Sequence, residues 1–364
     1  MRVALVHDYL NQYGGGERVL EALCEIWPEA PIFTLVYSPD HTGFAFESRK
    51  IFTSFLQKIP LVRGHHRSFL MLMPLAIEQF DLSKYDLVVS DAHSFAKGII
   101  TRPKTLHICY CHTPTRYVWD DSHKYIEEFN YPGIVKKFIP FFLNYLRLWD
   151  EAASLRPDTY IANSKFIQSR IKKYYQQSSE VIYPPVKTSH FYIGRPGDYF
   201  LIVSRLLPYK KVDLAVKVFN ELGWPLKIIG EGPEKKQLQS IAKSNIEFVG
   251  LVDEDELKDY YAHCRAFIFP QEEDFGITAV EAMASGRPVI AYRAGGVLEI
   301  VEENKTGIFF EEQTAQSLKE ALLKFQKMRF SPLGIREHAL QFDKEIFKQK
   351  IRDFAAKALE NKKQ

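Results

Sequence analysis

The chain has 364 residues, more than the roughly 250–300 at which a single hydrophobic core stops growing, so two domains are expected. Apolar residues make up 46% and charged residues 26%, which is typical of a globular protein. The net charge of +3 is too weak to indicate a nucleic-acid partner.

The amino terminus carries no secretory signal, because His7 and Asp8 interrupt the short apolar run Val3–Val6. No uncharged apolar stretch reaches the roughly 18 residues that a membrane span requires. The cysteines form no C-x-x-C pair, which favours reduced core thiols. These features predict a cytoplasmic protein.

Two alternations of strands and helices follow one another along the chain. In the first, buried strands are expected at Val3–Val6, Ile32–Tyr37, Asp86–Ser90, Thr105–Tyr110, Thr159–Asn163 and Val181–Tyr183, with helices at Glu17–Trp27 and Lys165–Tyr175. Pro184-Pro185 then breaks the pattern. In the second, strands are expected at Phe200–Ser204, Leu226–Gly230, Ile246–Val249, Ala266–Phe269, Pro288–Ala291 and Gly307–Phe310, with helices at Val212–Leu222, Thr278–Ser285 and Lys344–Leu359.

This alternation predicts an α/β fold of two Rossmann-like, doubly wound domains that face each other across a ligand cleft. The expected division is an N-terminal domain at 1–186, a linker at 187–198, a C-terminal domain at 199–343 and a terminal helix at 344–364 that packs back on the N-terminal domain.

The most specific segment runs from Pro270 to Ala284, where an expected strand ends and a helix begins. Seven residues separate Glu273 from Glu281, which puts the first in the loop and the second about one turn inside the helix. The helix N-terminus offers unpaired N–H groups to a diphosphate, and Gly276 lets the backbone approach a ligand closely. A carboxylate in the first turns can accept hydrogen bonds from ribose hydroxyls.

This segment resembles the E-x7-E motif of retaining glycosyltransferases of family four, whose two-domain fold is called GT-B. The resemblance implies that Glu273 contacts the donor sugar and takes part in catalysis, and that Glu281 binds the donor ribose. It also implies that the C-terminal domain binds the nucleotide sugar and the N-terminal domain the acceptor. The backbone near the helix start would hold sugar hydroxyls and phosphates, which adds Phe275, Gly276, Ile277 and Thr278 to the donor site.

A basic segment follows the first strand of the second domain and carries Arg205, Lys210 and Lys211. A leaving nucleoside diphosphate gains negative charge as its bond to the sugar breaks, so cations aimed at its phosphates stabilise the transition state. Family members carry Arg and, five positions later, Lys for this task, which Arg205 and Lys210 match as catalytic residues. Lys211 stands where many relatives have glycine, so the assignment between the two lysines stays open.

Gly14, Gly15 and Gly16 open the first helix. Alone they could be a degenerate dinucleotide fingerprint, with Val19 in place of the third glycine and Asp40 as the ribose-binding acid. The family resemblance instead implies that this loop faces the donor phosphates.

His112 comes directly after an expected strand, within an H-x-P-x-R-Y segment. Side chains at this end of a strand face the crevice where ligands bind, and similar segments of relatives lie near the donor sugar and the acceptor. The resemblance implies a catalytic role for His112. Arg116, Asp120 and Asp8 are candidate acceptor contacts.

Turns whose resemblance to the family is weaker complete the expected donor site. Gly230 and Val252 lie in segments that resemble those near the nucleotide, and Gly295–Glu299 resembles a turn that supports the site. Asp253–Asp255 matches the D-x-D metal motif of the other glycosyltransferase fold, but acids at this position are expected to cap a helix. No metal and no other cofactor is expected.

The whole chain resembles GDP-mannose-dependent α-mannosyltransferases of bacterial O-antigen and polysaccharide assembly. The resemblance implies transfer of a hexose from GDP-mannose, or another nucleotide sugar, to a glycan acceptor on a lipid carrier, as in lipopolysaccharide assembly. A UDP-sugar donor and a nucleotide-sugar epimerase are alternatives. A binding module without catalysis and a dehydrogenase are further rivals.

Two basic and apolar segments, 58–73 and 133–149, contain no acidic residue. Such segments can lie on an anionic membrane surface, here the inner face of the cytoplasmic membrane. They can equally form core helices with solvated basic edges, and both interpretations stay open.

Overall fold

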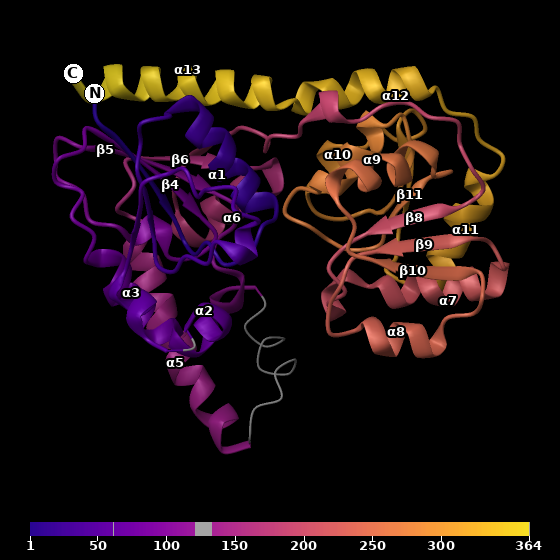
Figure 1. The fold of residues 1–364 in the computed structure, drawn as a ribbon, viewed down its shortest axis with the longest axis horizontal. Coiled ribbons are helices and arrows are strands. Elements are labelled where there is room, and N and C mark those ends of the chain that lie inside the picture. Colours follow the sequence, from indigo (N-terminus) through magenta and orange to yellow (C-terminus); the bar gives the residue numbers. More distant parts are fainter. Residues whose placement is uncertain (61, 121–132, 364) are drawn as a thin grey trace. The chain divides into compact units, whose positions relative to one another are not determined.

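The computed structural model describes residues 1–60, 62–120 and 133–363, and the chain divides into two compact units (Figure 1). Unit 1 comprises Met1–Pro185 and Phe347–Gln364, and unit 2 comprises Val186–Ile346. Each unit is built on its own parallel sheet with helices packed against it. The predicted class, two Rossmann-like α/β domains, is therefore confirmed.

The sheet of unit 1 has seven strands in the order β3-β2-β1-β4-β5-β6-β7. Alternate residues of the first strand enter two different cores, with Ala4 and Val6 on one face and Leu5 on the other. Burial on both faces explains why these strands read as continuous apolar runs. The strands are β1 Val3–His7, β2 Ile32–Thr34, β3 Ile51–Thr53, β4 Leu87–Ala92, β5 Leu106–Cys111, β6 Thr159–Ala162 and β7 Ser179–Val181.

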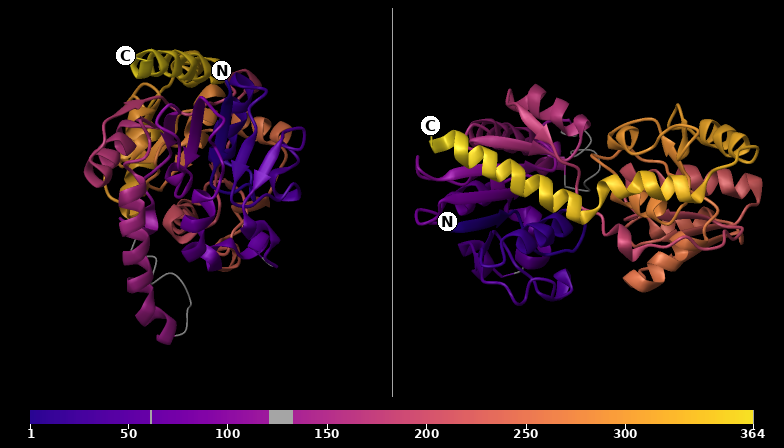
Figure 2. Two further views of the ribbon diagram at one scale, coloured as in Figure 1. Left: turned by 90° about the vertical axis from the view of Figure 1, so that its left-hand side faces the viewer. Right: turned by 90° about the horizontal axis from the view of Figure 1, so that it is seen from above.

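Helices cover both faces of this sheet (Figure 2). One face packs against α1 (Gly15–Ile26) and α13 (Lys344–Lys363), and the other against α3 (Met73–Glu78), α5 (Gly133–Ala153) and α6 (Lys165–Tyr175). Short helical segments complete the unit: η1 Asp40–Thr42, η2 Phe55–Lys58, α2 Val62–His65, η3 His66–Leu72, η4 Ala96–Gly98 and η5 Arg116–Val118. Because α13 supplies Phe347 and Ile351 to the core, the chain returns to unit 1 after building unit 2.

The sheet of unit 2 has six strands in the order β10-β9-β8-β11-β12-β13. The strands are β8 Phe200–Val203, β9 Leu226–Ile229, β10 Ile246–Gly250, β11 Phe267–Phe269, β12 Val289–Tyr292 and β13 Gly307–Phe310. The helices are α7 Val212–Leu222, α8 Lys235–Ile241, α9 Glu254–His263, α10 Ile277–Ala284, α11 Ala315–Phe325 and α12 Pro332–Ala339. The short segments are η6 Thr188–His190, η7 Pro208–Lys210, η8 Gly296–Glu299 and η9 Leu340–Phe342.

In each sheet the strand order reverses beside the unit's first strand, between β1 and β4 and between β8 and β11. Ligands of open α/β sheets bind outside the carboxyl ends of the strands at this reversal. The segments that follow these four strands are therefore where a site is expected. Within the described part of the chain, no helix combines the length and apolar character that crossing a membrane requires.

Candidate functional site

A buried network of histidines and carboxylates lies where β1 and β4 end. Asp91 Oδ2 lies 2.8 Å from His7 Nδ1, and Asp91 Oδ1 lies 2.5 Å from His112 Nε2. The other ring nitrogen of His7 lies 3.6 Å from a carboxylate oxygen of Glu17 on α1. The ring of His93 stacks on His112, with centroids 4.0 Å apart. The predicted catalytic His112 is thus held by a carboxylate of the neighbouring strand.

The charges in this network are set by burial and by neighbouring groups. Burial opposes protonation of His7, but its contacts with Asp91 and Glu17 raise the pKa of His7 to about 10. Burial also opposes ionisation of Asp91, yet His112 and His7 hold the pKa of that carboxyl well below its usual range. Burial, together with the charge of His112, lowers the pKa of His93 to about 4. At pH 7 the network therefore contains the His7 cation beside ionised Asp91, with His93 neutral.

The glycine loop enters α1 directly beside this network. Gly14 N donates a 2.8 Å hydrogen bond to Glu17 Oε2, which caps the helix. A Cβ atom at Gly16 would lie 2.1 Å from His93 Nε2, so a side chain there would displace the histidine. The predicted donor contacts Gly14, Gly15 and Gly16 thus lie at the N-terminus of a helix, the end at which backbone N–H groups and the helix dipole favour an anion.

Asp8 has a different environment from the one predicted for it. Its side chain is completely buried, and its two oxygens accept backbone hydrogen bonds of 2.6–2.8 Å from the four residues 93–96. These bonds fix the turn after β4 that carries His93. Asp8 therefore stabilises this turn, and its role toward an acceptor stays a prediction.

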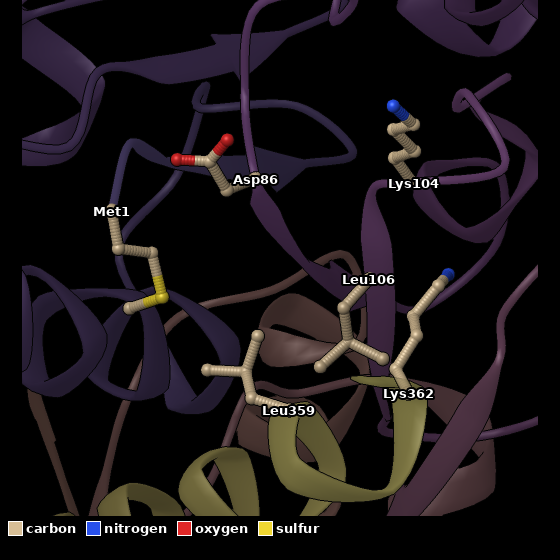
Figure 3. Close-up of a pocket in the computed structure, with 6 residues that line it drawn as sticks. All are labelled: Met1, Asp86, Lys104, Leu106, Leu359 and Lys362. Carbon is tan, nitrogen blue, oxygen red and sulfur yellow. The ribbon is translucent and has the colours of Figure 1, made fainter. Parts of the chain in front are cut away.

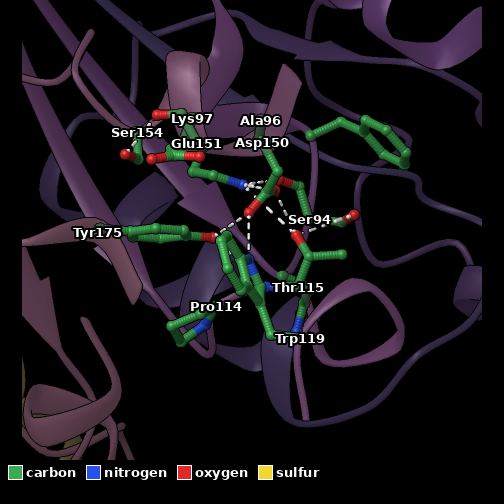
Figure 4. Close-up of polar contacts among 12 residues, drawn as sticks. Ser94, Ala96, Lys97, Pro114, Thr115, Trp119, Asp150, Glu151, Ser154 and Tyr175 are labelled. Atoms are coloured by element: carbon green, nitrogen blue, oxygen red, sulfur yellow. Dashed lines mark hydrogen bonds and ion pairs between the residues drawn. The ribbon is translucent and has the colours of Figure 1, made fainter. Parts of the chain in front are cut away.

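A further buried carboxylate, Asp150 on α5, holds the segment that follows β5 (Figure 4). It accepts hydrogen bonds from Lys97 Nζ at 2.5 Å, Thr115 Oγ1 at 2.6 Å, Trp119 Nε1 at 2.9 Å and the Tyr175 hydroxyl at 2.8 Å. Asp150 and Lys97 are both buried, so each compensates the other's charge. The network joins α5, α6 and the segments after β4 and β5.

Two predicted acceptor contacts lie on the segment that this network holds. Arg116 begins η5 and is half-buried. Asp120 pairs with Arg170 and accepts a hydrogen bond from Tyr174, both on α6. Their roles toward an acceptor stay predictions.

In unit 2, the predicted catalytic residues Lys210 and Glu273 form an ion pair. Lys210 ends η7, which follows β8, and Glu273 lies in the loop that follows β11. Their side chains are 12% and 19% exposed. Arg205 is exposed in the turn directly after β8. The structure therefore brings two of the predicted residues together at the reversal of the sheet, with the third on the same turn.

The loop that carries Glu273 is fixed by the glycine turn at 295–296. Gly296 N donates a 2.8 Å hydrogen bond to Glu273 O. Gly295 has φ +76°, and a Cβ there would lie 2.4 Å from that same oxygen. The backbone of Glu273 is thus held in place independently of its side chain.

The rest of the predicted donor site lies at the start of α10. Gly276, at φ +120°, caps the helix, and Phe275 is buried with its ring 5.6 Å from that of Phe342. Glu281, in the second turn, is buried, and the Tyr261 hydroxyl donates a 2.8 Å hydrogen bond to its Oε2. The first-turn residues Ile277 and Thr278 are half-buried.

Three further donor candidates lie on neighbouring turns. Lys211 adopts the left-handed conformation at φ +53°, which explains why a glycine suits this position in relatives. Gly230 has φ +132°, and a Cβ there would lie 2.0 Å from Ser204 O, so the loops after β8 and β9 touch through this glycine. Val252 is half-buried beyond β10.

The Asp253–Asp255 segment caps α9, as predicted. Asp253 Oδ1 accepts a 2.8 Å hydrogen bond from Glu256 N. Among the residues that the structure describes, no group of three or more His, Cys, Asp or Glu side chains is arranged to hold a metal ion.

One cavity of about 310 Å³ lies at the opposite, amino ends of the unit 1 strands (Figure 3). Met1, Asp86, Lys104 and Leu106 line it, together with Leu359 and Lys362 of α13. It is far in the fold from the strand ends where such sheets bind ligands, and we assign it no function.

Several residues that hold the site together have no role that the sequence predicts, namely His7, Glu17, Asp91, His93, Lys97, Asp150 and Tyr261. A signal was present for two of them, because His7 and Asp91 are charged or titratable residues directly after apolar strand segments. The others find their partners only through the tertiary fold.

Two family models together match nearly the whole chain. Residues 13–190 match a model described as Glycosyltransferase Family 4, and residues 193–347 match one described as Glycosyl transferases group 1. An uncharacterized glycosyltransferase of Methanocaldococcus jannaschii is 29% identical over 205 residues, which span 55% of this chain and 58% of that relative. The match thus leaves more than a third of this relative's length uncovered.

Two relatives carry named activities. An alpha-1,3/1,6-mannosyltransferase of Dictyostelium discoideum is 25% identical over 73% of this chain and 72% of its own length. A GDP-mannose-dependent alpha-(1-6)-phosphatidylinositol monomannoside mannosyltransferase of Mycobacterium tuberculosis is 32% identical, over 33% of this chain and 36% of its own length.

Among solved structures, the Anabaena protein HepE in complex with UDP and glucose superposes with a TM-score of 0.74 at 17% identity, covering 98% of this chain and 99% of that one. At this identity the likeness shows the fold alone. The two adjoining family matches and the shared fold make this chain similar to glycosyltransferases of family 4, which have the GT-B fold.

Proposed function

We propose that this protein is a retaining glycosyltransferase that moves mannose from GDP-mannose to a glycan acceptor on a lipid carrier. The observation that carries the proposal is the ion pair of Lys210 with Glu273 at the strand reversal of unit 2, with Arg205 on the same turn as Lys210. Cations suit the phosphates of a leaving nucleoside diphosphate, and a carboxylate suits the hydroxyls of a sugar.

Retention follows from attack on the same face of the sugar as the leaving group. The acceptor oxygen forms its bond to the anomeric carbon while the bond from that carbon to the diphosphate breaks, and the acceptor proton passes to a phosphate oxygen. A double displacement would need a second carboxylate about 5 Å from an acid across the bond, and the sequence offers no candidate for it. Arg205 and Lys210 then stabilise the departing charge, and no step calls for a metal.

The choice of mannose and GDP draws on the two mannosyltransferase relatives, one of which is named as GDP-mannose-dependent. A UDP-sugar is the second candidate, because the similar fold of HepE was solved with UDP and glucose. An epimerase on the same fold would need no acceptor, so product formation without acceptor separates it from a transferase.

The donor is tested by thermal unfolding with a panel of GDP- and UDP-sugars, with and without EDTA. A ligand at 100 times its dissociation constant adds about 2.7 kcal/mol of stability, so the donor raises the unfolding temperature clearly. We expect a shift with GDP and GDP-mannose in both conditions. A shift with UDP-sugars alone discards mannose and keeps the fold and chemistry, and the absence of any shift contradicts the transferase proposal.

The roles of the cations are tested by Arg205→Ala. Loss of one group that stabilises transition-state charge lowers kcat by about 100- to 1000-fold. Arg329→Ala, which removes an exposed arginine of the same unit, is the matched control and should retain wild-type turnover. Wild-type turnover by Arg205→Ala would rule out its proposed role.

An acceptor on a lipid carrier lies at a membrane, so we also propose that the protein contacts a membrane surface. On α5, Phe141, Tyr145 and Leu148 are 73%, 47% and 60% exposed and recur at a spacing that keeps them on one helix face. The 133–149 segment carries three basic residues and no acid, which suits an anionic surface. The side chains at 133–138, and those at 61, 63 and 65–67 in the companion segment 58–73, lie outside the described residues.

Flotation with vesicles of anionic phospholipid tests this contact. Wild-type protein should float with the vesicles, and Leu148→Glu should not. Leu333→Glu, at a 68% exposed leucine of α12, is the control and should float as the wild type does. Equal flotation of all three proteins would contradict contact through α5.

A further inference from the structure

The ligand-free site of unit 2 already contains an internal partner for its phosphate-binding lysine. Lys210 and Glu273 form an ion pair in which both side chains are largely buried. Each is the group that the proposed function assigns to a different half of the donor, the lysine to the diphosphate and the carboxylate to the sugar. A ligand that draws Lys210 toward its phosphates therefore competes with Glu273 for the ammonium group.

We propose that Glu273 makes the site discriminate between the nucleotide sugar and the released nucleoside diphosphate, by competing with the diphosphate for Lys210. This inference rests on the proposed function. The residue thereby promotes release of the product, in addition to any contact with the sugar.

The geometry decides which partner of the pair moves. The backbone of Glu273 is held by the hydrogen bond from Gly296 and by the close approach of Gly295. The ammonium of Lys210 is carried by a long flexible side chain, and it lies 4.9 Å from the centroid of the Tyr209 ring, which offers it a further contact. The carboxylate therefore stays in place while the lysine turns toward the phosphates.

The discrimination follows from what each ligand offers the carboxylate. A nucleotide sugar takes Lys210 with its diphosphate and supplies sugar hydroxyls that donate hydrogen bonds to Glu273, so both groups remain satisfied. The product diphosphate takes Lys210 but supplies no such hydroxyl. A partly buried carboxylate is then left without its cation and beside a ligand of the same sign, which favours return of the lysine and departure of the product.

Glu273→Gln tests the competition, because the amide keeps the size of the side chain and removes its charge. Isothermal titration calorimetry measures the dissociation constants of the nucleoside diphosphate and of the nucleotide sugar that the donor panel selects. We expect the diphosphate to bind about tenfold more tightly to Glu273→Gln, the change that about 1.4 kcal/mol produces. The nucleotide sugar should gain nothing or bind more weakly, since a sugar-binding carboxylate is lost.

Glu272→Gln is the matched control, because it removes the same charge from the adjacent, exposed residue. It should bind both ligands as the wild type does. The inhibition constant of the diphosphate product should fall in Glu273→Gln, and the unfolding temperature of each ligand-free variant verifies that it is folded.

Three results would overturn the inference while leaving the proposed function intact: unchanged diphosphate affinity in Glu273→Gln, equal tightening of both ligands, or the same tightening in Glu272→Gln. Failure of the wild type to bind any nucleotide is distinguishable from these, and it would overturn the proposed function together with this inference.

Discussion

Buried histidines of unit 1 link its stability to pH in opposite directions. The contacts of His7 with Asp91 and Glu17 raise the pKa of His7 to about 10, so its contribution is complete below pH 6.5 and is lost as the pH rises toward 10. Burial lowers the pKa of His107 to about 3, so its contribution is complete above pH 6.5 and is lost as the pH falls. His93 behaves like His107.

The acid side of this dependence is tested with His107→Gln. His107 Nε2 lies 2.8 Å from Ser90 Oγ, and its other nitrogen has no hydrogen-bond partner in the described part of the chain. Between pH 7 and pH 5 the wild type should lose about 2 kcal/mol of unfolding free energy through this group alone, since only the unfolded state takes up the proton. Denaturant titrations at the two pH values should show a smaller loss in His107→Gln by this amount, and an equal loss in both proteins would contradict the assignment.

Substitution of Lys211 allows backbone strain and phosphate binding to be measured separately at one position. Its left-handed backbone, at φ +53°, costs a side chain about 1 kcal/mol relative to glycine. Lys211→Gly should therefore unfold at a temperature a few degrees higher, as differential scanning calorimetry can measure. If Lys210 alone serves the phosphates, the KM for the donor is unchanged, and a higher KM assigns part of this task to Lys211.

At this scale the sequence predicted the residues that belong to local motifs. Glu273, Lys210 and Gly276 lie within seven positions of a strand end, on segments that follow the strands at the reversal of the sheet. The hydrogen bonds of Asp8 were not predicted, because the sequence cannot show that the N–H groups of 93–96, which follow another strand, lie beside it. The hydrogen bond between His7 and Asp91 could not be predicted either, because the two residues are 84 positions apart in the sequence.

At the scale of secondary-structure elements, the helices with clear capping residues at an end were predicted with the correct bounds. Ser164 caps α6 by accepting a hydrogen bond from Ile167 N, and Gly223 ends α7 in the left-handed conformation. The helices expected at Lys165–Tyr175 and Val212–Leu222 match these bounds. The strand expected at Ile32–Tyr37 ends at Thr34, because Leu35 N donates to Asp8 O in the loop after β1 and leaves the ladder.

Short elements were missed for a different reason. Strand β3 has three residues and α8 has seven, too few for a hydrophobic period to be recognised. Strand β7 was expected at 181–183 and lies at 179–181, where its burial is partial and its apolar pattern correspondingly weak. Tertiary pairing with β6 sets its position.

The contact between the turns after β8 and β9 is tested at Gly230, with Gly223 at the end of α7 as the control. Gly230→Ala places a Cβ 2.0 Å from Ser204 O at φ +132°, so it should cost several kcal/mol and abolish donor binding. Gly223→Ala shares the positive φ but has no atom within 4 Å of the new Cβ, so strain of about 1 kcal/mol should be its whole effect. Denaturant unfolding compares the two, and equal losses would contradict the steric account.

At the scale of the whole molecule, two domains could be predicted from the strand–helix alternation, because this alternation can be recognised from the hydrophobic periodicity of the sequence alone. Which helices pack on which sheet face depends on contacts between distant segments. The terminal helix was expected to pack on the N-terminal domain, but the sheet face that α13 covers is set by Phe347 and Ile351, which pack in a core with Leu5 and Ile108, more than 200 positions away.

The contribution of α13 is tested at two adjacent residues. Phe347 is 2% exposed with its ring 5.7 Å from that of Tyr110, whereas Ile346 is 40% exposed. Phe347→Ala should lower the unfolding free energy of unit 1 by about 3–5 kcal/mol, and Ile346→Ala by less than about 0.5 kcal/mol. Circular dichroism during denaturation measures both, and a small effect of Phe347→Ala would contradict the packing of α13.

The late return of the chain to unit 1 has a consequence for its biosynthesis. A ribosome delivers residues 186–346 before it delivers the helix that covers Leu5, Val89 and Ile108. Unit 2 can fold as soon as it has emerged, while the first 185 residues wait with an uncovered apolar face. The nascent protein thus presents an apolar, chaperone-binding surface while residues 186–346 are synthesised, and unit 1 becomes native after unit 2.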